Sequence, residues 1–228
     1  MNIYRADAFS SVPWLEHGFG TRGVALSDYL MQLGLKDSIF AKTNQRHGNR
    51  VFVIDDDMPR EVLEGDGFLT QTPGVVCFVR TADCVPVLLC DPENRAVGAI
   101  HAGWRGHVCD VIGHAVREMK NVFGTDSSKL LAAIGPSICP SCYFVGEEVI
   151  GEFRRNGFAS ALWNESPSRN GYSLNLKRAS RELLISSGLD KNNIATLELC
   201  TSCHNGDFAS YRREKTDNSR QVNFICMK

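Results

Sequence analysis

The chain has 228 residues, of which 43% are hydrophobic and 22% are charged, and its formal net charge is −1. A chain of this length and composition can bury a substantial core in one large or two small soluble domains. The sequence has neither the basic excess that favours nucleic-acid binding nor a charge run that favours a membrane surface. No apolar stretch approaches the ~20 residues that a helix needs to cross a bilayer. We therefore expect no nucleic acid and no membrane among its partners.

The chain contains nine cysteines, which is a high count. Its first residues, MNIYRADAF, lack a basic segment followed by an apolar one, so no secretion signal is visible. We therefore expect a cytoplasmic protein. In that reducing compartment, free thiols and metal ligation are more common than disulfides.

A glycine-rich stretch at residues 17–23, HGFGTRG, predicts a loop or a bulged strand end. Arg22 in this stretch either faces solvent or binds phosphate, because a guanidinium presents a fork of donors that matches a phosphate group. A short helix is predicted next, from a cap at Ser27 and Asp28 through Leu33.

Three short strands follow, and two polar residues flank them. Val51–Ile54 predicts a strand, and His47 lies in the loop that enters it. Phe68–Thr70 and Val75–Val79 predict two more strands, and the second of them leads towards Asp83. Asp83 can orient a neighbouring ligand or bond a sugar hydroxyl, and satisfying loop amides is the alternative.

The pattern around Cys84 predicts a buried β-hairpin. Val85–Cys90 and Ala96–Ile100 are apolar runs typical of strands, and a turn containing a proline separates them. The hairpin brings Cys84 and His101 together although they are 17 positions apart. With His47 they form a set suited to a catalytic zinc ion, which keeps its fourth position open. A nucleophilic thiol–imidazole pair without metal is the alternative.

The hairpin is followed by the turn GWRG at residues 103–106, which leads into a helix. Backbone N–H groups at such a junction can hold an anion, and Arg105 adds positive charge there. The alternative is that Arg105 braces the turn by bonding nearby carbonyl groups.

The second half of the chain alternates helical and strand patterns. The apolar spacing of Val108–Phe123 predicts one helix, which Gly124 ends. The polar stretch Phe158–Gly171 predicts a flexible, irregular loop. The other expected elements are a helix that begins near Gly146, a helix over Ser180–Ser187, and strands at Leu130–Ile134, Ile194–Leu199 and Gln221–Cys226.

Two CxxC pairs occur, Cys139 with Cys142 and Cys200 with Cys203, and 57 residues separate them. Paired CxxC motifs often form a zinc site with four thiolate ligands. Buried thiols that pack as small hydrophobic residues are the alternative.

Several motifs in order along the chain resemble one known family. They are QRHGNRV at residues 45–51, ADCVP at 82–86, HAGWRG at 101–106, GPSICPSCYFVG at 135–146 and CTSCHNGDFASYRR at 200–213. Together they resemble the laccase-domain family. Its members were first described as multicopper polyphenol oxidoreductases and later as zinc-dependent purine nucleoside phosphorylases with adenosine deaminase activity. The resemblance spans nearly the whole chain, and the combination of HAGWRG with ADCxP is specific.

The resemblance implies one α+β domain over residues 1–228, with mixed β-sheets packed with flanking helices. It implies that zinc, rather than copper, is bound by His47, Cys84 and His101, which are then the catalytic residues. The implied substrates are phosphate and purine nucleosides such as adenosine, inosine, guanosine and methylthioadenosine, with deamination of adenosine as a second activity. The candidate residues for binding substrate or phosphate are Arg22, Gln45, Asp83 and Arg105.

Three other functions remain as alternatives. A copper-dependent polyphenol oxidoreductase needs many histidines, including HxH pairs, whereas this chain has six histidines and no HxH pair. A metal-free cysteine hydrolase would use Cys84 and His101 directly. A non-catalytic binding protein on the same fold would leave this chemistry unused.

Overall fold

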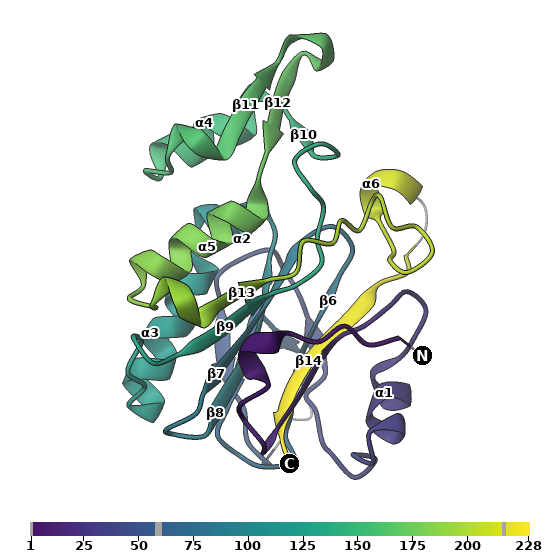
Figure 1. Ribbon diagram of the computed structural model, residues 1–228, viewed down its shortest axis with the longest axis vertical. Coiled ribbons are helices and arrows are strands. Elements are labelled where there is room, and N and C mark those ends of the chain that lie inside the picture. The colour runs from purple at the N-terminus through teal and green to yellow at the C-terminus, as the bar shows by residue number, and fades with distance from the viewer. Residues whose placement is uncertain (1, 58–60, 216–217) are drawn as a thin grey trace.

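Two β-sheets packed face to face form the centre of the molecule (Figure 1). The structure is a computed structural model that describes residues 2–57, 61–215 and 218–228. Within these residues the larger sheet has six strands in the order β13-β9-β7-β8-β5-β3, and the smaller has three in the order β1-β14-β6. The larger sheet contains β3 (Val51–Val53), β5 (Gly67–Thr70), β7 (Val85–Asp91), β8 (Ala96–Ala102), β9 (Leu131–Ile134) and β13 (Ile194–Thr196). The smaller contains β1 (Leu15–Phe19), β6 (Val76–Thr81) and β14 (Gln221–Met227).

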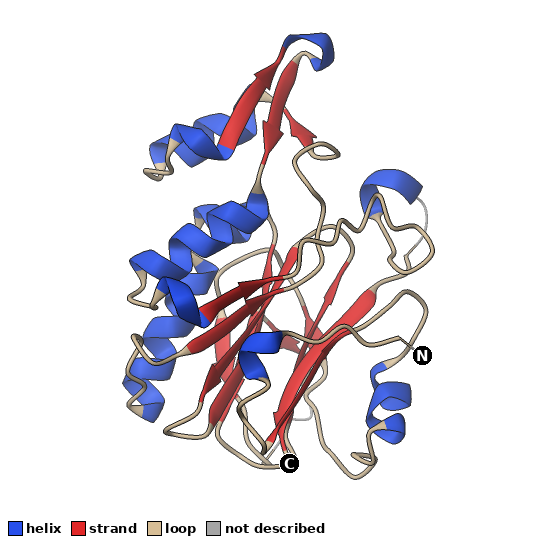
Figure 2. Ribbon diagram, in the orientation of Figure 1, coloured by secondary structure: helices blue, strands red, loops and turns tan. Residues whose placement is uncertain are grey.

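Helices cover the outer faces of both sheets (Figure 2). The helices α2 (Trp104–Val108), α3 (Val111–Phe123) and α5 (Leu176–Ser186) pack on the larger sheet. The helix α1 (Leu26–Gln32) packs on the smaller one. The larger sheet is mixed, because β13 pairs parallel with β9 and β3 pairs parallel with β5, while its other pairs are antiparallel. This arrangement confirms the α+β class that the resemblance implied.

A smaller unit projects from the larger sheet, at the top of Figure 1. It contains α4 (Glu147–Arg155) and the strands β10 (Phe144–Val145), β11 (Trp163–Ser166) and β12 (Gly171–Leu174). The remaining described elements are a short pair of strands, β2 (Thr43–Asn44) and β4 (Leu63–Glu64), the helix α6 (Tyr211–Glu214), and single 3-10 turns at Asp7–Phe9, Ser160–Leu162, Pro167–Arg169 and Lys191–Asn193.

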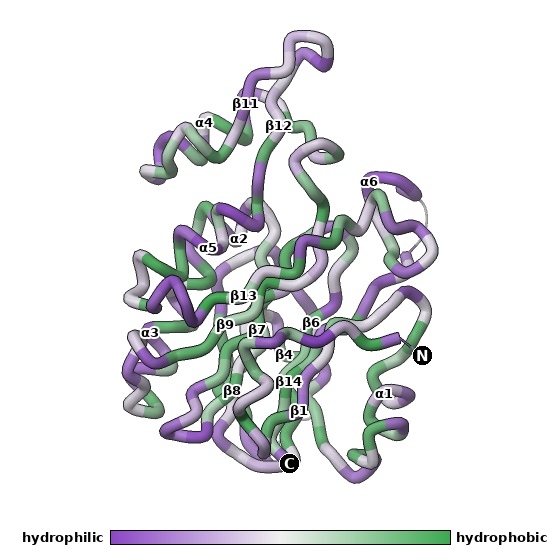
Figure 3. The backbone as a smooth tube through the Cα atoms, viewed as in Figure 1, coloured by the Kyte–Doolittle hydropathy of each residue, from purple (hydrophilic) through white to green (hydrophobic). Residues whose placement is uncertain are grey.

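The central strands are apolar on both faces because both faces are covered. Side chains alternate along β7, so Val85, Val87 and Leu89 pack under the helices whereas Leu88 and Cys90 pack between the two sheets. All seven residues of β7 are buried. Apolar residues accordingly follow the central strands in Figure 3. In the part of the chain that the structure describes, no helix combines the length and apolarity needed to cross a membrane.

Three predicted elements were wrong in their extent. The strand expected over Ile194–Leu199 ends at Thr196. The single helix expected over Val108–Phe123 is two helices, α2 and α3, with the junction at Asp110. Asp110 has a left-handed backbone, with φ of 57°, and its carboxylate accepts the N–H of Gly113, which caps α3. Helix α5 begins at Leu176, ahead of the predicted Ser180, because Asn175 caps it by accepting the N–H of Arg178.

The prediction of an irregular loop over Phe158–Gly171 was also wrong. This stretch contains β11, which pairs antiparallel with β12, and Trp163 lies opposite Leu174 in that pair. Leu162 and Trp163 are buried in the core shared with α4, and they anchor the hairpin. The polar residues that suggested a loop are mostly exposed, at Asn164, Glu165 and residues 167–170.

The first testable prediction concerns His17, a buried residue of β1 whose Nε2 accepts the N–H of Ala6. Burial lowers the pKa of His17 from 6.5 to about 4. The unfolded chain therefore takes up a proton at a higher pH than the folded chain does. The stability that the neutral ring contributes is complete above pH ~6.5 and is lost as the pH falls towards 4. Between pH 7 and 5 the folded state should lose about 2 kcal/mol from this residue.

Urea unfolding of His17→Gln beside the unchanged protein measures this contribution. The variant should show a weaker loss of stability between pH 7 and 5. His114→Gln, at a histidine with its side chain 35% exposed on α3, serves as the matched control. Equal pH slopes for His17→Gln and the unchanged protein would contradict the prediction.

Candidate active site and metal centre

The hairpin of β7 and β8 places two of the predicted ligands side by side. In its register Pro86 lies opposite His101 and Val85 lies opposite Ala102. Cys84, which directly precedes β7, therefore lies next to His101 near the end of β8. The predicted hairpin and the predicted approach of these two residues are both confirmed.

His47 completes the group from a loop on the other side. Its Nε2 lies 3.9 Å from the Sγ of Cys84, and its ring meets that of His101 edge-on at 4.7 Å between centroids. The ligand atoms of all three residues lie within 4.8 Å of one another. His47 has a φ of 58°, in the left-handed region that few non-glycine residues adopt. This backbone is held by the carboxylate of Asp66, which accepts the N–H of His47 at 2.9 Å.

Asp66 is a fully buried carboxylate behind the ligand set. Its Oδ1 lies 2.8 Å from the Nδ1 of His101, and its Oδ2 accepts the N–H groups of Arg46 and Gly48. A carboxylate on Nδ1 fixes the ring and leaves Nε2 as the nitrogen that can bind a metal. Asp66 was not among the predicted site residues, because the sequence around it, GDG, indicated only a turn.

The three residues fit a zinc ion by chemistry and by spacing. Zinc–sulfur and zinc–nitrogen bonds of ~2.3 and ~2.1 Å in a tetrahedral arrangement place the ligand atoms ~3.5 Å apart. The 3.9 Å between Cys84 and His47 is close to this distance. The backbone at Gly103 leaves room for the group, since a Cβ at that position would lie 2.9 Å from the His47 ring and 3.1 Å from the Cys84 sulfur.

The ionisation of the group also suits a metal. Burial raises the pKa of the Cys84 thiol, but the charge and hydrogen bond of His101, and then those of His47, outweigh burial and bring the pKa to about 6. Burial lowers the pKa of His101, yet the neighbouring Cys84 and Asp66 raise it to about 9. Cys84 is therefore held as a thiolate near neutral pH, which is the form that binds metal.

A cavity of about 580 Å³ opens beside these residues. Guanidinium groups from separate segments line it, and Asp83 is the only carboxylate among the described lining residues. Aromatic rings of Trp104, Tyr143 and Tyr211 form further parts of the wall. The cavity can therefore receive a molecule that combines an anionic group with a flat ring. The lining arginines are Arg80, Arg105, Arg212 and Arg220.

Arg105 and Gln45, two predicted binding residues, both line this cavity. The guanidinium of Arg105 lies over the Trp104 ring, 4.2 Å from its centroid, and makes no hydrogen bond to any described residue. The alternative role, in which Arg105 braces the turn by bonding nearby carbonyls, is therefore not seen in the described residues. The Gln45 amide donates to the carbonyl of Arg80 at 2.8 Å and accepts the N–H of Arg80 at 2.7 Å. It therefore holds the backbone of a neighbouring part of the cavity wall in place.

Asp83 lies at the cavity wall with its carboxylate already bonded. One oxygen accepts the Thr201 hydroxyl and the other accepts the N–H of Arg212, both at 2.7 Å. Its backbone has a φ of 82°, again in the left-handed region. The side chain therefore fixes the turn before Cys84 to the segment that carries Arg212.

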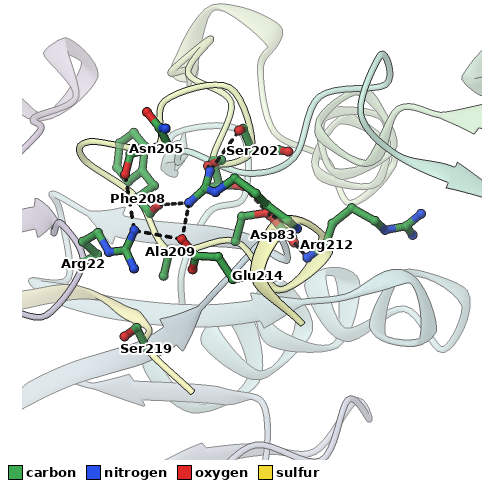
Figure 4. A network of polar contacts seen from close by, with 12 residues as sticks. Arg22, Asp83, Ser202, Asn205, Phe208, Ala209, Arg212, Glu214 and Ser219 are labelled. Carbon is green, nitrogen blue, oxygen red and sulfur yellow. Dashed lines mark hydrogen bonds and ion pairs between the residues drawn. The ribbon is translucent and has the colours of Figure 1, made fainter. Parts of the chain in front are cut away.

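Arg22 belongs to the polar network of Figure 4, which also contains the cavity residues Asp83 and Arg212. Its guanidinium bonds the Glu214 carboxylate at 2.8 Å, and Arg213 bonds the same carboxylate oxygen at 2.9 Å. Arg22 is not among the described residues that line the cavity. The structure thus brings Gln45, Asp83 and Arg105 to the predicted ligand set but does not bring Arg22 there.

Comparison with known proteins agrees with the motifs. Residues 25–228 match the model of a family described as multi-copper polyphenol oxidoreductase laccase. The chain belongs to this laccase family. Two curated relatives are an adenosine deaminase, RL5, from an unknown prokaryote and a purine nucleoside phosphorylase from Deinococcus radiodurans. The first is 34% identical over 87% of this chain and 79% of the relative, and the second is 38% identical over 82% and 70%.

A solved structure shares the fold. The crystal structure of YlmD from Geobacillus stearothermophilus superposes with a TM-score of 0.89 at 26% identity, and covers 100% of this chain and 97% of that one. The resemblance stated from the motifs is thereby confirmed.

Sequence reasoning missed part of the wall of this laccase-family cavity. Arg212 stacks over the Tyr143 ring, 5.1 Å from its centroid, and donates to the carbonyl of Phe144. Burial raises the pKa of Tyr143 well above its usual value, so its ring carries a neutral hydroxyl. Both residues lie inside the quoted motifs, since Tyr143 is part of GPSICPSCYFVG and Arg212 is the first arginine of SYRR. The signal was therefore present, but no spacing rule links these positions to the ligand set.

Proposed function

We propose that this protein is a zinc-dependent purine nucleoside phosphorylase that also deaminates adenosine. The observation that carries the proposal is one cavity with the His47, Cys84 and His101 set on one wall and several guanidinium groups on the others. The functions by which the two relatives are named support it. The expected nucleosides are adenosine, inosine, guanosine and methylthioadenosine.

Phosphorolysis breaks the bond between C1′ of the ribose and the purine nitrogen, and forms a bond between C1′ and a phosphate oxygen. Positive charge develops on the ribose and negative charge on the departing purine. The enzyme must therefore hold phosphate next to the sugar and receive charge on the base. The guanidinium of Arg105, which makes no hydrogen bond to a described residue, is suited to hold phosphate, because charge-assisted bonds to phosphate oxygens are strong.

The aromatic residues of the wall are suited to bind the base. A purine has a flat face on each side, and base–aromatic stacking contributes ~1–3 kcal/mol per base. Tyr143 and Trp104 each carry an arginine against one part of the ring. These arginines keep the rings in place and bring positive charge close to the bound substrate.

The metal would be held by His47, Cys84 and His101, with Asp66 fixing the orientation of His101. When bound, zinc supplies a Lewis acid and lowers the pKa of a bound water towards ~7, chemistry that deamination of adenosine needs. The described residues offer two groups of metal ligands, and together these contain only two histidines. That ligand set favours zinc over a multicopper oxidase centre.

Product analysis tests the proposed reactions. Purified protein is incubated with adenosine, inosine, guanosine and methylthioadenosine, with and without phosphate. We expect free purine base only when phosphate is present, and inosine with ammonia from adenosine in either case. Oxidation of phenols with uptake of oxygen, together with no change in any nucleoside, would overturn the proposal in favour of the copper enzyme.

Arg105→Met is the second testable prediction. The loss of a charge-assisted phosphate bond, of ~1.5–3 kcal/mol, should raise the KM for phosphate or lower turnover by about 10–100-fold. The melting temperature should stay near that of the unchanged protein, because the guanidinium of Arg105 makes no hydrogen bond to a described residue. Steady-state phosphorolysis of inosine at varied phosphate, beside a thermal melt, measures both quantities.

Arg117→Met is the matched control, since Arg117 is an exposed arginine of α3 that is paired with Asp110. It should leave the phosphate KM unchanged. If Arg105→Met melts several degrees lower with unaltered kinetics, Arg105 has a bracing role and does not bind phosphate.

A further inference from the structure

The two CxxC pairs meet in space. Cys139, Cys142, Cys200 and Cys203 form a group, here called the tetrathiol cluster, whose sulfur atoms all lie within 4.8 Å of one another. The Sγ atoms of Cys142 and Cys203 are 3.5 Å apart, and the N–H of Cys139 points to the Sγ of Cys200 at 3.2 Å. All four thiols are free. This group is distinct from the His47, Cys84 and His101 set.

The pairing of β9 with β13 explains why distant cysteines meet. These strands are parallel neighbours, so their carboxyl ends lie side by side and the chain leaves both strands at the same place. The pairing continues beyond the strands, since Ser137 forms a parallel bridge with Cys200 and its N–H donates to the carbonyl of Leu199. Each of the two segments then turns at its CxxC pair. In the first turn the N–H of Cys142 donates to the carbonyl of Cys139.

We propose that a structural zinc ion is bound by the tetrathiol cluster and joins these two loops. Four thiolates around one point satisfy the tetrahedral preference of zinc completely, as in structural sites that keep no open position. Zinc–sulfur bonds of ~2.3 Å place the sulfur atoms ~3.8 Å apart, close to the 3.5 Å between Cys142 and Cys203. A disulfide would require ~2 Å between two of them.

The surroundings supply a compensating charge. Four thiolates around a divalent ion leave a net charge of two minus. The ammonium of Lys177 is buried near the cluster, where it also forms an ion pair with the exposed Glu198 at 3.5 Å. Lys177 also donates to the carbonyls of Leu197 and Leu199, on the strand side of the second loop. A buried cation is suited to offset the negative charge of such a site.

The bound zinc would position one wall of the substrate cavity. Ile138 and Tyr143, which flank the first CxxC, both line the cavity. Thr201, which follows Cys200, donates to Asp83 beside the catalytic ligand Cys84. Metal at the tetrathiol cluster therefore fixes these groups against one another. This last consequence rests on the proposed function, whereas the zinc site itself does not.

Zinc content measured by mass spectrometry on Cys84→Ser protein, purified with reductant and passed over a chelating resin, tests the site. We expect about one tightly held zinc per chain in this variant and about two in the unchanged protein. The difference between the two proteins reports the active-site metal, and the content of Cys84→Ser reports the tetrathiol cluster. One zinc in the unchanged protein and none in Cys84→Ser would overturn the cluster site while leaving the proposed function intact. One zinc in each would support the cluster and overturn the active-site metal.

A second variant removes two ligands of the tetrathiol cluster directly. Cys142→Ser/Cys203→Ser should lose the second zinc and melt at a lower temperature, and its KM for inosine should rise. Cys109→Ser, at a part-buried cysteine outside both groups, is the matched control and should keep both ions. If the double variant does not fold, cobalt added to chelated Cys84→Ser protein decides the question. Strong thiolate-to-cobalt absorption supports the site, and its absence, or a disulfide among the four cysteines, overturns it.

Discussion

Replacing Cys84 with serine should abolish turnover of purine nucleosides and remove the active-site zinc. The neighbouring histidines lower the pKa of the Cys84 thiol to about 6, so it is a thiolate at neutral pH. A serine hydroxyl stays protonated there and is a poor zinc ligand. Loss of a direct ligand should lower metal affinity by more than the ~10–100-fold typical of a lost supporting carboxylate. Zinc titration against a competing chelator and the rate of inosine cleavage measure the two effects.

Cys109→Ser is again the control for a cysteine replacement outside the site. It should keep full affinity and full turnover. If Cys84→Ser cleaves inosine at the rate of the unchanged protein, Cys84 is not part of the reacting site. If Cys84→Ser loses activity while binding the same zinc with the same affinity, Cys84 acts as a nucleophile and is not a metal ligand.

Asp66→Asn should weaken metal binding by about 10–100-fold. The carboxylate of Asp66 faces the Nδ1 of His101 and accepts three backbone N–H groups around His47. An asparagine turns an NH₂ group towards at least one of these donors, so the orientation of both histidines is lost. Buried donors without partners also cost ~1–3 kcal/mol each, so the variant should be less stable.

Asp91→Asn separates the metal effect from simple destabilisation. Asp91 is a buried carboxylate at the far end of the same hairpin, where it accepts the N–H groups of Glu93 and Asn94. That variant should melt lower but keep its zinc affinity. If both variants lose stability alike and Asp66→Asn retains normal zinc affinity, Asp66 supports the fold and does not position the ligand.

The hairpin that carries Cys84 and His101 could be predicted because it is local. Its two apolar runs and the turn between them lie within one short segment, so pairing follows from spacing alone. The prediction was less good where packing decides the structure. The polar segment after Phe158 forms a hairpin because Trp163 is anchored in the core with α4, and nothing in its own residues indicates that partner.

Contacts between residues far apart in the sequence could not be predicted either. Asp66 reaches His101 because β5 pairs with β8, and the two CxxC turns meet because β9 lies beside β13. Both contacts depend on the order of strands in the sheet, which periodicity does not reveal. The same limit applies to Arg22, whose partner Glu214 lies almost at the other end of the chain.

The most direct test of the proposed function is the identity of the sugar product formed from inosine and phosphate. The purified zinc-loaded protein is incubated with both, and the products are separated and followed by phosphorus NMR. We predict hypoxanthine and ribose 1-phosphate in equal amounts, with neither formed when phosphate is omitted and neither formed by Cys84→Ser. Free ribose, or hypoxanthine released equally without phosphate, would show hydrolysis instead and would contradict phosphorolysis at this site.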